Sequence, residues 1–346
     1  MDCLYLTMPI AGIDVFWPGL VVLGLGVGII GGFFGVGGAW MVTPGLNILG
    51  FPMAFAIGTG VTQVAGVSIA GTARHAKLGN VDARMGFVMA LGTMLGVRVG
   101  AGVVMWLERL AMVETGVSAA YVVLLLLIAW MVVTDIRAAK RAKQAGQDEE
   151  EAGIQWYKRL QRIPLPPAVQ FPVAGVRCTV WLPAGAGLIV GVMSGLLGIG
   201  GGVLALPLLI YAVGCSAHVA VGTSLFTIMI SGMYGAFTYS MYGRTELLAA
   251  IVMLAGASFG AHIGATATKY VKGTGIKYAF AGAVIGCAVS VVLKQLAAAC
   301  ERHRGLLTGL SLGLVLVLVC SLCVYIIVSM VIGIRRELAG GEGGHD

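Results

Sequence analysis

Long apolar segments alternate with short polar loops along most of the chain. A helix rises about 1.5 Å per residue and the hydrocarbon core of a membrane is about 30 Å thick, so a span needs about 20 apolar residues. Most segments approach this length, but 39–50 and 203–214 reach only about half-way. The pattern predicts an all-α polytopic membrane protein in which the two short segments either span or re-enter. The apolar segments are 16–34, 39–50, 53–73, 85–107, 116–135, 181–198, 203–214, 217–242, 247–268, 276–297 and 306–334.

A glycine-rich turn followed by a proline occurs once in each half of the chain. Residues 35–38, Gly-Val-Gly-Gly, and Pro44 match residues 198–201, Gly-Ile-Gly-Gly, and Pro207 at an offset of 163 residues. A register held over such a length indicates an internal duplication, which is typical of transporter folds. After one inserted residue the match continues at an offset of 164, in Gly58/Gly222, Thr59/Thr223, Gly71/Gly235, Gly79/Gly243, Val88/Val252, Met89/Met253, Gly92/Gly256, Gly96/Gly260 and Gly100/Gly264.

The basic residues of the loops predict how the halves lie in the membrane. Loop 74–84 and the linker 136–178 are rich in Lys and Arg, whereas loop 108–115 is acidic, so the first two are expected in the cytoplasm. Counting spans onward places the repeat partner of loop 74–84, around Gly243, outside. We therefore predict two inverted-topology repeats whose broken or re-entrant helices meet near the midplane. The basic loop 298–305, which the same count places outside, does not fit this scheme.

The same pattern divides the chain into four parts. We predict a first transmembrane repeat at 1–135, a cytoplasmic linker at 136–180, a second repeat at 181–300 and an extra C-terminal span with a tail at 301–346. The linker contains basic, acidic and proline-rich stretches together with the amphipathic "IQWYKRLQR", which suits a helix at the membrane interface.

Composition agrees with a membrane protein and narrows its chemistry. Hydrophobic residues make up 58% of the chain and charged residues 11%, too few to cover a water-soluble surface. The net charge of +7 lies mainly in loops, so it indicates the orientation of the spans and no nucleic-acid partner.

The first apolar segment lacks a basic leader, so it is expected to remain in the protein as a membrane span. Seven scattered cysteines imply no disulfide framework. We expect no metal site and no cofactor.

The two glycine turns are candidate binding loops. In hydrocarbon, irregular backbone is tolerated only where it is buried in protein or lines a wet cavity. Glycine lets backbone amides approach a ligand, and the helix that follows offers free N–H groups to an anion. The alternative is close helix packing, which we expect for the stripes Gly92-x3-Gly96-x3-Gly100 and Gly256-x3-Gly260-x3-Gly264. The candidate binding glycines are Gly37, Gly38, Gly200 and Gly201.

Polar side chains within the spans are few. Arg98 and His262 occupy matching repeat positions and are candidates for binding or gating; the alternatives are snorkelling for Arg98 and packing for His262. No Asp or Glu lies deep in an apolar segment, which favours an anionic substrate. Hydroxyl and amide groups that follow the glycine turns could complete an oxyanion site, although helical Ser and Thr also bond back to the preceding turn. These are Thr59, Thr62, Gln63, Thr223, Ser224 and Thr227.

These motifs resemble the TauE/SafE family of membrane permeases, also described as sulfite exporters. The similarity covers about 18–110 and 181–300, and the second copy, "GLLGIGGGVLALPLLI" with "AVGTSL", fits best. The first copy differs, with Trp40 in place of Val203 and Gly60 in place of Ser224. The resemblance implies transport of small sulfur-containing anions such as sulfite or organosulfonates.

The leading functional hypothesis is a secondary transporter of such anions in the cell inner membrane. An inside-negative potential favours anion efflux, so we expect an exporter. A passive anion channel, and an importer of another small organic anion coupled to protons or sodium, are alternatives. We expect no enzyme, because the spans contain no plausible metal cluster or Ser-His pair. The lipid bilayer is the expected partner, and a homodimer is an open alternative to a monomer.

Overall fold

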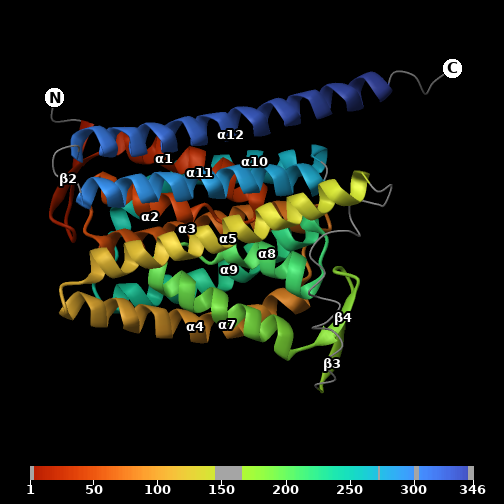
Figure 1. Cartoon of the computed structure of the whole chain (residues 1–346), viewed down its shortest axis with the longest axis horizontal. Coiled ribbons are helices and arrows are strands. Elements are labelled where there is room, and N and C mark those ends of the chain that lie inside the picture. Colours follow the sequence, from red (N-terminus) through yellow and green to blue (C-terminus); the bar gives the residue numbers. More distant parts are fainter. Residues whose placement is uncertain (1–3, 145–165, 272, 300–303, 342–346) are drawn as a thin grey trace.

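The computed structural model describes residues 4–144, 166–271, 273–299 and 304–341. The chain forms a bundle of roughly parallel and antiparallel helices, with α12 along one edge and α4 and α7 along the opposite edge (Figure 1). The first half contains β1 Tyr5–Met8, β2 Ile13–Phe16, α1 Trp17–Phe34, α2 Ala39–Ile48, α3 Met53–Lys77, α4 Ala83–Arg109 and α5 Val113–Gln144. The second contains β3 Ala168–Phe171, β4 Val176–Thr179, α7 Trp181–Leu197, α8 Gly202–Pro207, the π-helix η2 Leu208–Val213, α9 Ala217–Met241, α10 Leu247–Ala267, the 3-10 turn η3 Thr268–Tyr270, α11 Gly273–Ala299 and α12 Arg304–Gly341.

The prediction of an all-α polytopic membrane protein is confirmed. Each predicted apolar segment forms helix, and within the described ranges seven helices are long and apolar enough to cross a membrane. One boundary differs, because α5 continues to Gln144, beyond the expected start of the linker at 136. The amphipathic stretch "IQWYKRLQR" lies outside the described residues. That the repeats are inverted in the membrane stays a prediction.

Two β-hairpins, which hydropathy did not predict, lie at opposite ends of the bundle (Figure 1). β1 pairs with β2 directly before α1, and β3 pairs with β4 directly before α7. Their turns, residues 9–12 and 172–175, are related by the offset of 163 that also relates the glycine turns. The duplication therefore begins with the hairpins, and β3–β4 occupies the end of the region expected to be a linker.

A buried carboxylate of the opposite half holds each hairpin turn. Asp82, directly before α4, accepts hydrogen bonds through Oδ2 from the N–H groups of Val173 and Ala174, both at 3.1 Å. Glu246, directly before α10, accepts through Oε2 from the N–H groups of residues 10 and 11, at 2.8 and 2.9 Å. The two carboxylates are each 1% exposed and are repeat partners. The halves are thus linked by the same contact at both ends of the bundle.

Glycine stripes join the halves a second time. α1 packs along α10 and α4 along α7, and a side chain on any stripe glycine would overlap the backbone of the facing helix. This confirms the sequence-based expectation that Gly92, Gly96, Gly100, Gly256, Gly260 and Gly264 serve close packing. The contact is two-sided, because the facing helices contribute Gly187, Gly191 and Gly195 in α7 and Gly24, Gly28 and Gly32 in α1.

Candidate functional site

Each glycine turn reverses the direction of the chain inside the bundle. α1 ends at Phe34, and Gly35, Gly37 and Gly38 adopt φ angles of 70°, 67° and 76°, a left-handed conformation that glycine adopts without strain. α2 then runs back along α1, since Gly38 packs on Val27 and Gly45 on Leu23. The second half repeats this arrangement at Gly198, Gly200 and Gly201, with φ angles of 69°, 64° and 81°. The two short segments therefore fold back and do not form separate spans.

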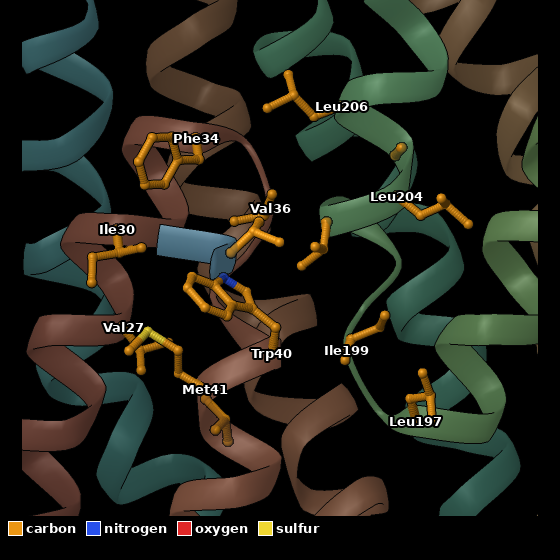
Figure 2. Packing of buried hydrophobic residues seen from close by; sticks show 14 of the residues in the cluster. Val27, Ile30, Phe34, Val36, Trp40, Met41, Leu197, Ile199, Leu204 and Leu206 are labelled. Carbon is orange, nitrogen blue, oxygen red and sulfur yellow. The ribbon is translucent and has the colours of Figure 1, made fainter. Parts of the chain in front are cut away.

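The tips of the two folded-back segments meet in the buried centre. A Cβ on Gly202 would overlap the backbone of Val36, so the tips touch with no side chain between them. Figure 2 shows Val36 of the first turn above Trp40, with Ile199 of the second turn to the right. The Trp40 ring is fully buried, and its indole N–H has no hydrogen-bond partner within the described part of the chain. Its repeat partner is Val203, so the centre is polar on the side of the first half.

Hydroxyl groups bind the carbonyls at the two turns, but from different positions. Ser224 on α9 donates to the Gly35 carbonyl at 2.6 Å. The repeat partner of Ser224 is Gly60, which has no hydroxyl, and Thr43 on α2 donates to the Gly198 carbonyl instead, at 3.2 Å. Thr43 thus replaces the hydroxyl that Gly60 lacks, and Ser224 has a structural contact in this conformation.

Thr43→Ala is expected to destabilise the protein by about 1–2 kcal/mol, because a buried carbonyl loses its donor and a small cavity forms. Gly60→Ser in the Thr43→Ala background should recover part of this loss, since a Cβ at residue 60 lies 3.6 Å from the Gly198 oxygen. Gly60→Ala in the same background is the control for the gain in helix propensity. Unfolding titrations in detergent measure all three, and equal stability of the Ser and Ala variants would contradict the compensation.

The carbonyls of Gly32 and Gly195, in the last turns of α1 and α7, are also hydrogen-bonded by two side chains at matching repeat positions. His75 Nε2 lies 3.1 Å from the Gly32 carbonyl, and because a carbonyl only accepts, Nε2 carries the proton. The hydroxyl of Tyr239, the repeat partner of His75, donates to the Gly195 carbonyl. Tyr121 on α5 donates to the Leu197 carbonyl at 3.0 Å. The ends of α1 and α7 are therefore capped by side chains from helices packed around them.

The Gly-Thr pairs at 58–59 and 222–223 have a common structural role. A Cβ on Gly58 would overlap the carbonyl of Arg244, and a Cβ on Gly222 that of Asn80, so these glycines admit the loops before α10 and α4. The hydroxyl oxygens of Thr59 and Thr223 accept hydrogen bonds from the N–H groups of Glu246, at 2.9 Å, and Asp82, at 3.0 Å. Both threonines thus bind the backbone of the residues whose carboxylates anchor the hairpins.

The other predicted polar residues divide into three groups. Thr62 and Thr227 bond back to the carbonyls of Gly58 and Thr223, and Thr227 also donates to Gly86. Gln63 is fully buried, and neither the oxygen nor the nitrogen of its amide has a partner among the described residues. Arg98 and His262 are exposed, on the helix faces opposite the glycine stripes, so the structure does not bring them to the glycine turns.

Other buried polar groups near the turns were missed by sequence reasoning. Ser68, Thr72 and His75 on α3, like Trp40 on α2, each carry a buried N or O atom that has no partner in the ranges that the structure describes. A comparison of the repeats would have singled them out, because residues 232, 236, 239 and 203 are Gly, Ala, Tyr and Val. Within the described ranges, no group of three or more His, Cys, Asp or Glu could hold a metal ion.

Comparison with known proteins assigns the fold to a family. The family model described as sulfite exporter TauE/SafE matches residues 20–291. The chain belongs to the TauE/SafE family. The probable membrane transporter protein YunE of Bacillus subtilis is 27% identical over 72% of this TauE/SafE chain and 88% of its own length. The probable membrane transporter protein YdhB of the same organism is 24% identical over 70% of this chain and 86% of its own. No solved structure matches the chain.

The residues matched by the TauE/SafE model include the candidate site. The match begins in α1 and ends in α11, so it includes both glycine turns and the helices around them. The β1–β2 hairpin and α12 lie outside it. α12 packs on α11, where Ser290 and Ser311 exchange hydrogen bonds, and on α1. The chain is thus a multi-pass membrane protein of a transporter family, with an additional C-terminal helix.

Proposed function

We propose that the protein is a secondary transporter that exports small sulfur-containing anions, such as sulfite or organosulfonates, across the cytoplasmic membrane. The observation that carries the proposal is the meeting of two glycine-rich tips in the buried centre of a TauE/SafE bundle, beside polar groups that lack protein partners. Buried polar groups are normally hydrogen-bonded, so such groups mark a place for a ligand or water.

The chemistry around the tips favours an anion. α2 begins at the first tip, and the N-terminal end of a helix presents free N–H groups and a positive dipole. The unpartnered indole N–H of Trp40, in the first turn of α2, adds a donor. The buried carboxylates Asp82 and Glu246 stand at helix ends, and each anchors a hairpin by accepting two backbone hydrogen bonds through one oxygen. Oε1 of Glu246 has no partner among the described residues.

Alternating access between inverted repeats is the mechanism we propose. It is supported by the equivalent contacts in the two halves: a hairpin, a carboxylate anchor, a glycine stripe and a folded-back segment, with the hairpins at opposite ends of the bundle (Figure 1). A site at the contact of two such halves can open to either side. Moving one negative charge outward gains about 2.3 kcal/mol per 100 mV of inside-negative potential, which drives export without a nucleotide.

The test is sulfite flux into liposomes that contain the purified protein. We expect saturable uptake that internal sulfite accelerates and that an inside-positive potential increases. Trp40→Phe, which keeps an aromatic ring and removes the N–H, should raise KM severalfold, because a hydrogen bond to a charged ligand is lost. Trp181→Phe is the matched control, since that indole is exposed and bonds to the Pro166 carbonyl. Absence of flux for sulfite and for sulfonates would refute the substrate class, and non-saturable flux without counterflow would indicate a channel.

A further inference from the structure

One face of α3 carries three buried polar groups without protein partners. Among the residues that the structure describes, the hydroxyls of Ser68 and Thr72 and the Nδ1 atom of His75 have no hydrogen-bond partner. The three residues are four and three positions apart, so they lie above one another on the same face of the helix. Ser68 and His75 are 0% exposed and Thr72 is 7% exposed. Groups buried to this degree without partners are costly unless something binds them.

This face lies against the first glycine turn. A Cβ built on Gly37 would be 3.3 Å from the Ser68 hydroxyl oxygen, so Ser68 is directed at the turn from which α2 begins. At the other end of the face, His75 Nε2 donates to the Gly32 carbonyl in the last turn of α1. Thr72 lies one turn from each. The unpartnered atoms therefore lie in a row along α3, from the first glycine turn to the last turn of α1.

The second half folds without such a face. The repeat partners of Ser68, Thr72 and His75 are Gly232, Ala236 and Tyr239. The first two have no polar side chain, and the Tyr239 hydroxyl is bonded to the Gly195 carbonyl. The same architecture is thus built once with the unpartnered groups and once without them. The fold itself does not require them, which points to a ligand.

The hydrogen-bonding character of the three groups defines that ligand. Ser68 and Thr72 can donate to oxygen atoms of an anion. Because the proton of neutral His75 is on Nε2, Nδ1 is an acceptor and must face a donor. Arg74, the residue before His75 on α3, carries a positive charge, and positive charge there favours a negative ligand. A small oxyanion that keeps one acidic O–H satisfies all three groups.

We infer that Ser68, Thr72 and His75 form a binding site for a monoprotonated oxyanion, such as hydrogen sulfite, beside Gly37. The two hydroxyls donate to its oxygens, and its acidic O–H donates to His75 Nδ1. The inference rests on the proposed function in that it names the form of the transported anion and the side chains that hold it. It places the site in the first half only.

The first test compares isosteric removals of hydroxyls. Ser68→Ala and Thr72→Val should each raise the KM for sulfite roughly tenfold, the cost of one hydrogen bond to a charged ligand. Neither should lower the melting temperature of the ligand-free protein, because the hydroxyl removed is unpartnered. Ser231→Ala and Thr93→Val are matched controls. Their hydroxyls are equally buried but bond to the carbonyls of Thr227 and Met89, at 2.9 and 2.8 Å, so KM should stay unchanged.

A measurement of hydrogen sulfite binding that does not depend on transport distinguishes the binding site from the proposed transport function. The ligand should raise the melting temperature of the wild-type protein, and the rise should shrink in Ser68→Ala and Thr72→Val but persist in both controls. No flux of any sulfur anion would refute the proposed function, whatever the thermal result. No thermal shift in the wild type, or equal shifts and equal KM in the Ser68 and Thr72 variants, would refute the site.

His75→Tyr tests whether Nδ1 of His75 accepts a hydrogen bond from the ligand. Tyr239 shows that a tyrosine at this repeat position can bond to the helix-end carbonyl, so the variant keeps that bond and removes Nδ1. At one fixed pH, the KM for hydrogen sulfite should rise roughly tenfold. The KM for methanesulfonate, which has no acidic proton, should not rise in parallel. An equal effect on both anions would refute the proposed role of Nδ1.

Discussion

Gly96→Val is expected to leave little folded protein, with a loss of at least about 3 kcal/mol in the free energy of unfolding. A Cβ on Gly96 would overlap the carbonyl of Leu188 and approach the backbone of Val192. These atoms belong to the backbone of α7, so no change of rotamer makes room. α4 and α7 would have to separate, and the contacts of the neighbouring stripe glycines would be lost with them.

Gly102→Val on the same helix is the control. Nothing lies within 4 Å of a Cβ at residue 102, and this residue is exposed. The two variants make the same change in composition and in helix propensity, so their difference reports the helix contact alone. Unfolding in detergent and the yield of monodisperse protein after purification are the measurements. Similar stability of both variants would show that the helices can move apart at little cost.

The helices and the glycine stripes could be predicted because their signals are local. Hydropathy marks each apolar segment, and a glycine at every fourth position marks a helix face that touches another helix. The stripe also carried information that sequence reasoning did not use. Arg98 lies between Gly96 and Gly100, and His262 between Gly260 and Gly264, so both must point away from the packed face. The matching repeat positions of Arg98 and His262 suggested a binding site, whereas the helical geometry indicates that both side chains are exposed.

The hairpins were missed because four-residue strands leave almost no periodic signal in an apolar chain. Their turns nevertheless repeat at the offset of 163 already established for the glycine turns. The role of Thr59 and Thr223 was beyond sequence reasoning for another reason. Their partners are backbone N–H groups of the opposite half, and no local pattern reveals which loop folds onto which helix.

The candidate site was predicted in outline only. The glycine turns were located from the sequence, and their meeting in the centre follows from the duplication. Which side chains near them lack partners depends on the packing of α3 against α1 and α2. Gln63 was named among the candidates and Ser68 was not, although both are polar, buried and unpartnered. The differences between the halves, more than their similarities, identify the groups free to bind a ligand.

Asp82→Ala should cost about 3 kcal/mol and release the β3–β4 hairpin from the bundle. The carboxylate accepts from the N–H of Met85 through Oδ1, which caps α4, and from the N–H groups of Val173 and Ala174 through Oδ2. Hydrogen bonds to a charged group are stronger than neutral ones, and here removal leaves three donors without a partner. The loss of the helix cap alone accounts for about 1 kcal/mol.

Two measurements test the Asp82→Ala prediction. The free energy of unfolding reports the total loss, and the rate of trypsin cleavage at the exposed Arg177 in β4 reports release of the hairpin. Asp14→Ala is the control, because Asp14 is exposed and accepts a hydrogen bond from the exposed Thr7 hydroxyl, at 2.6 Å. It should change stability by less than about 0.5 kcal/mol. Unchanged cleavage at Arg177 in Asp82→Ala would show that the strands hold the hairpin without the carboxylate.

Glu246→Ala extends the argument to the other end of the bundle. Glu246 accepts two backbone hydrogen bonds from the β1–β2 turn, but it makes no cap bond to α10. If the hydrogen bonds to the carboxylate account for the effect, Glu246→Ala should cost less than Asp82→Ala by about the value of one cap, roughly 1 kcal/mol. It should loosen β1–β2 and leave cleavage at Arg177 unchanged, because each carboxylate holds only the hairpin of the opposite half.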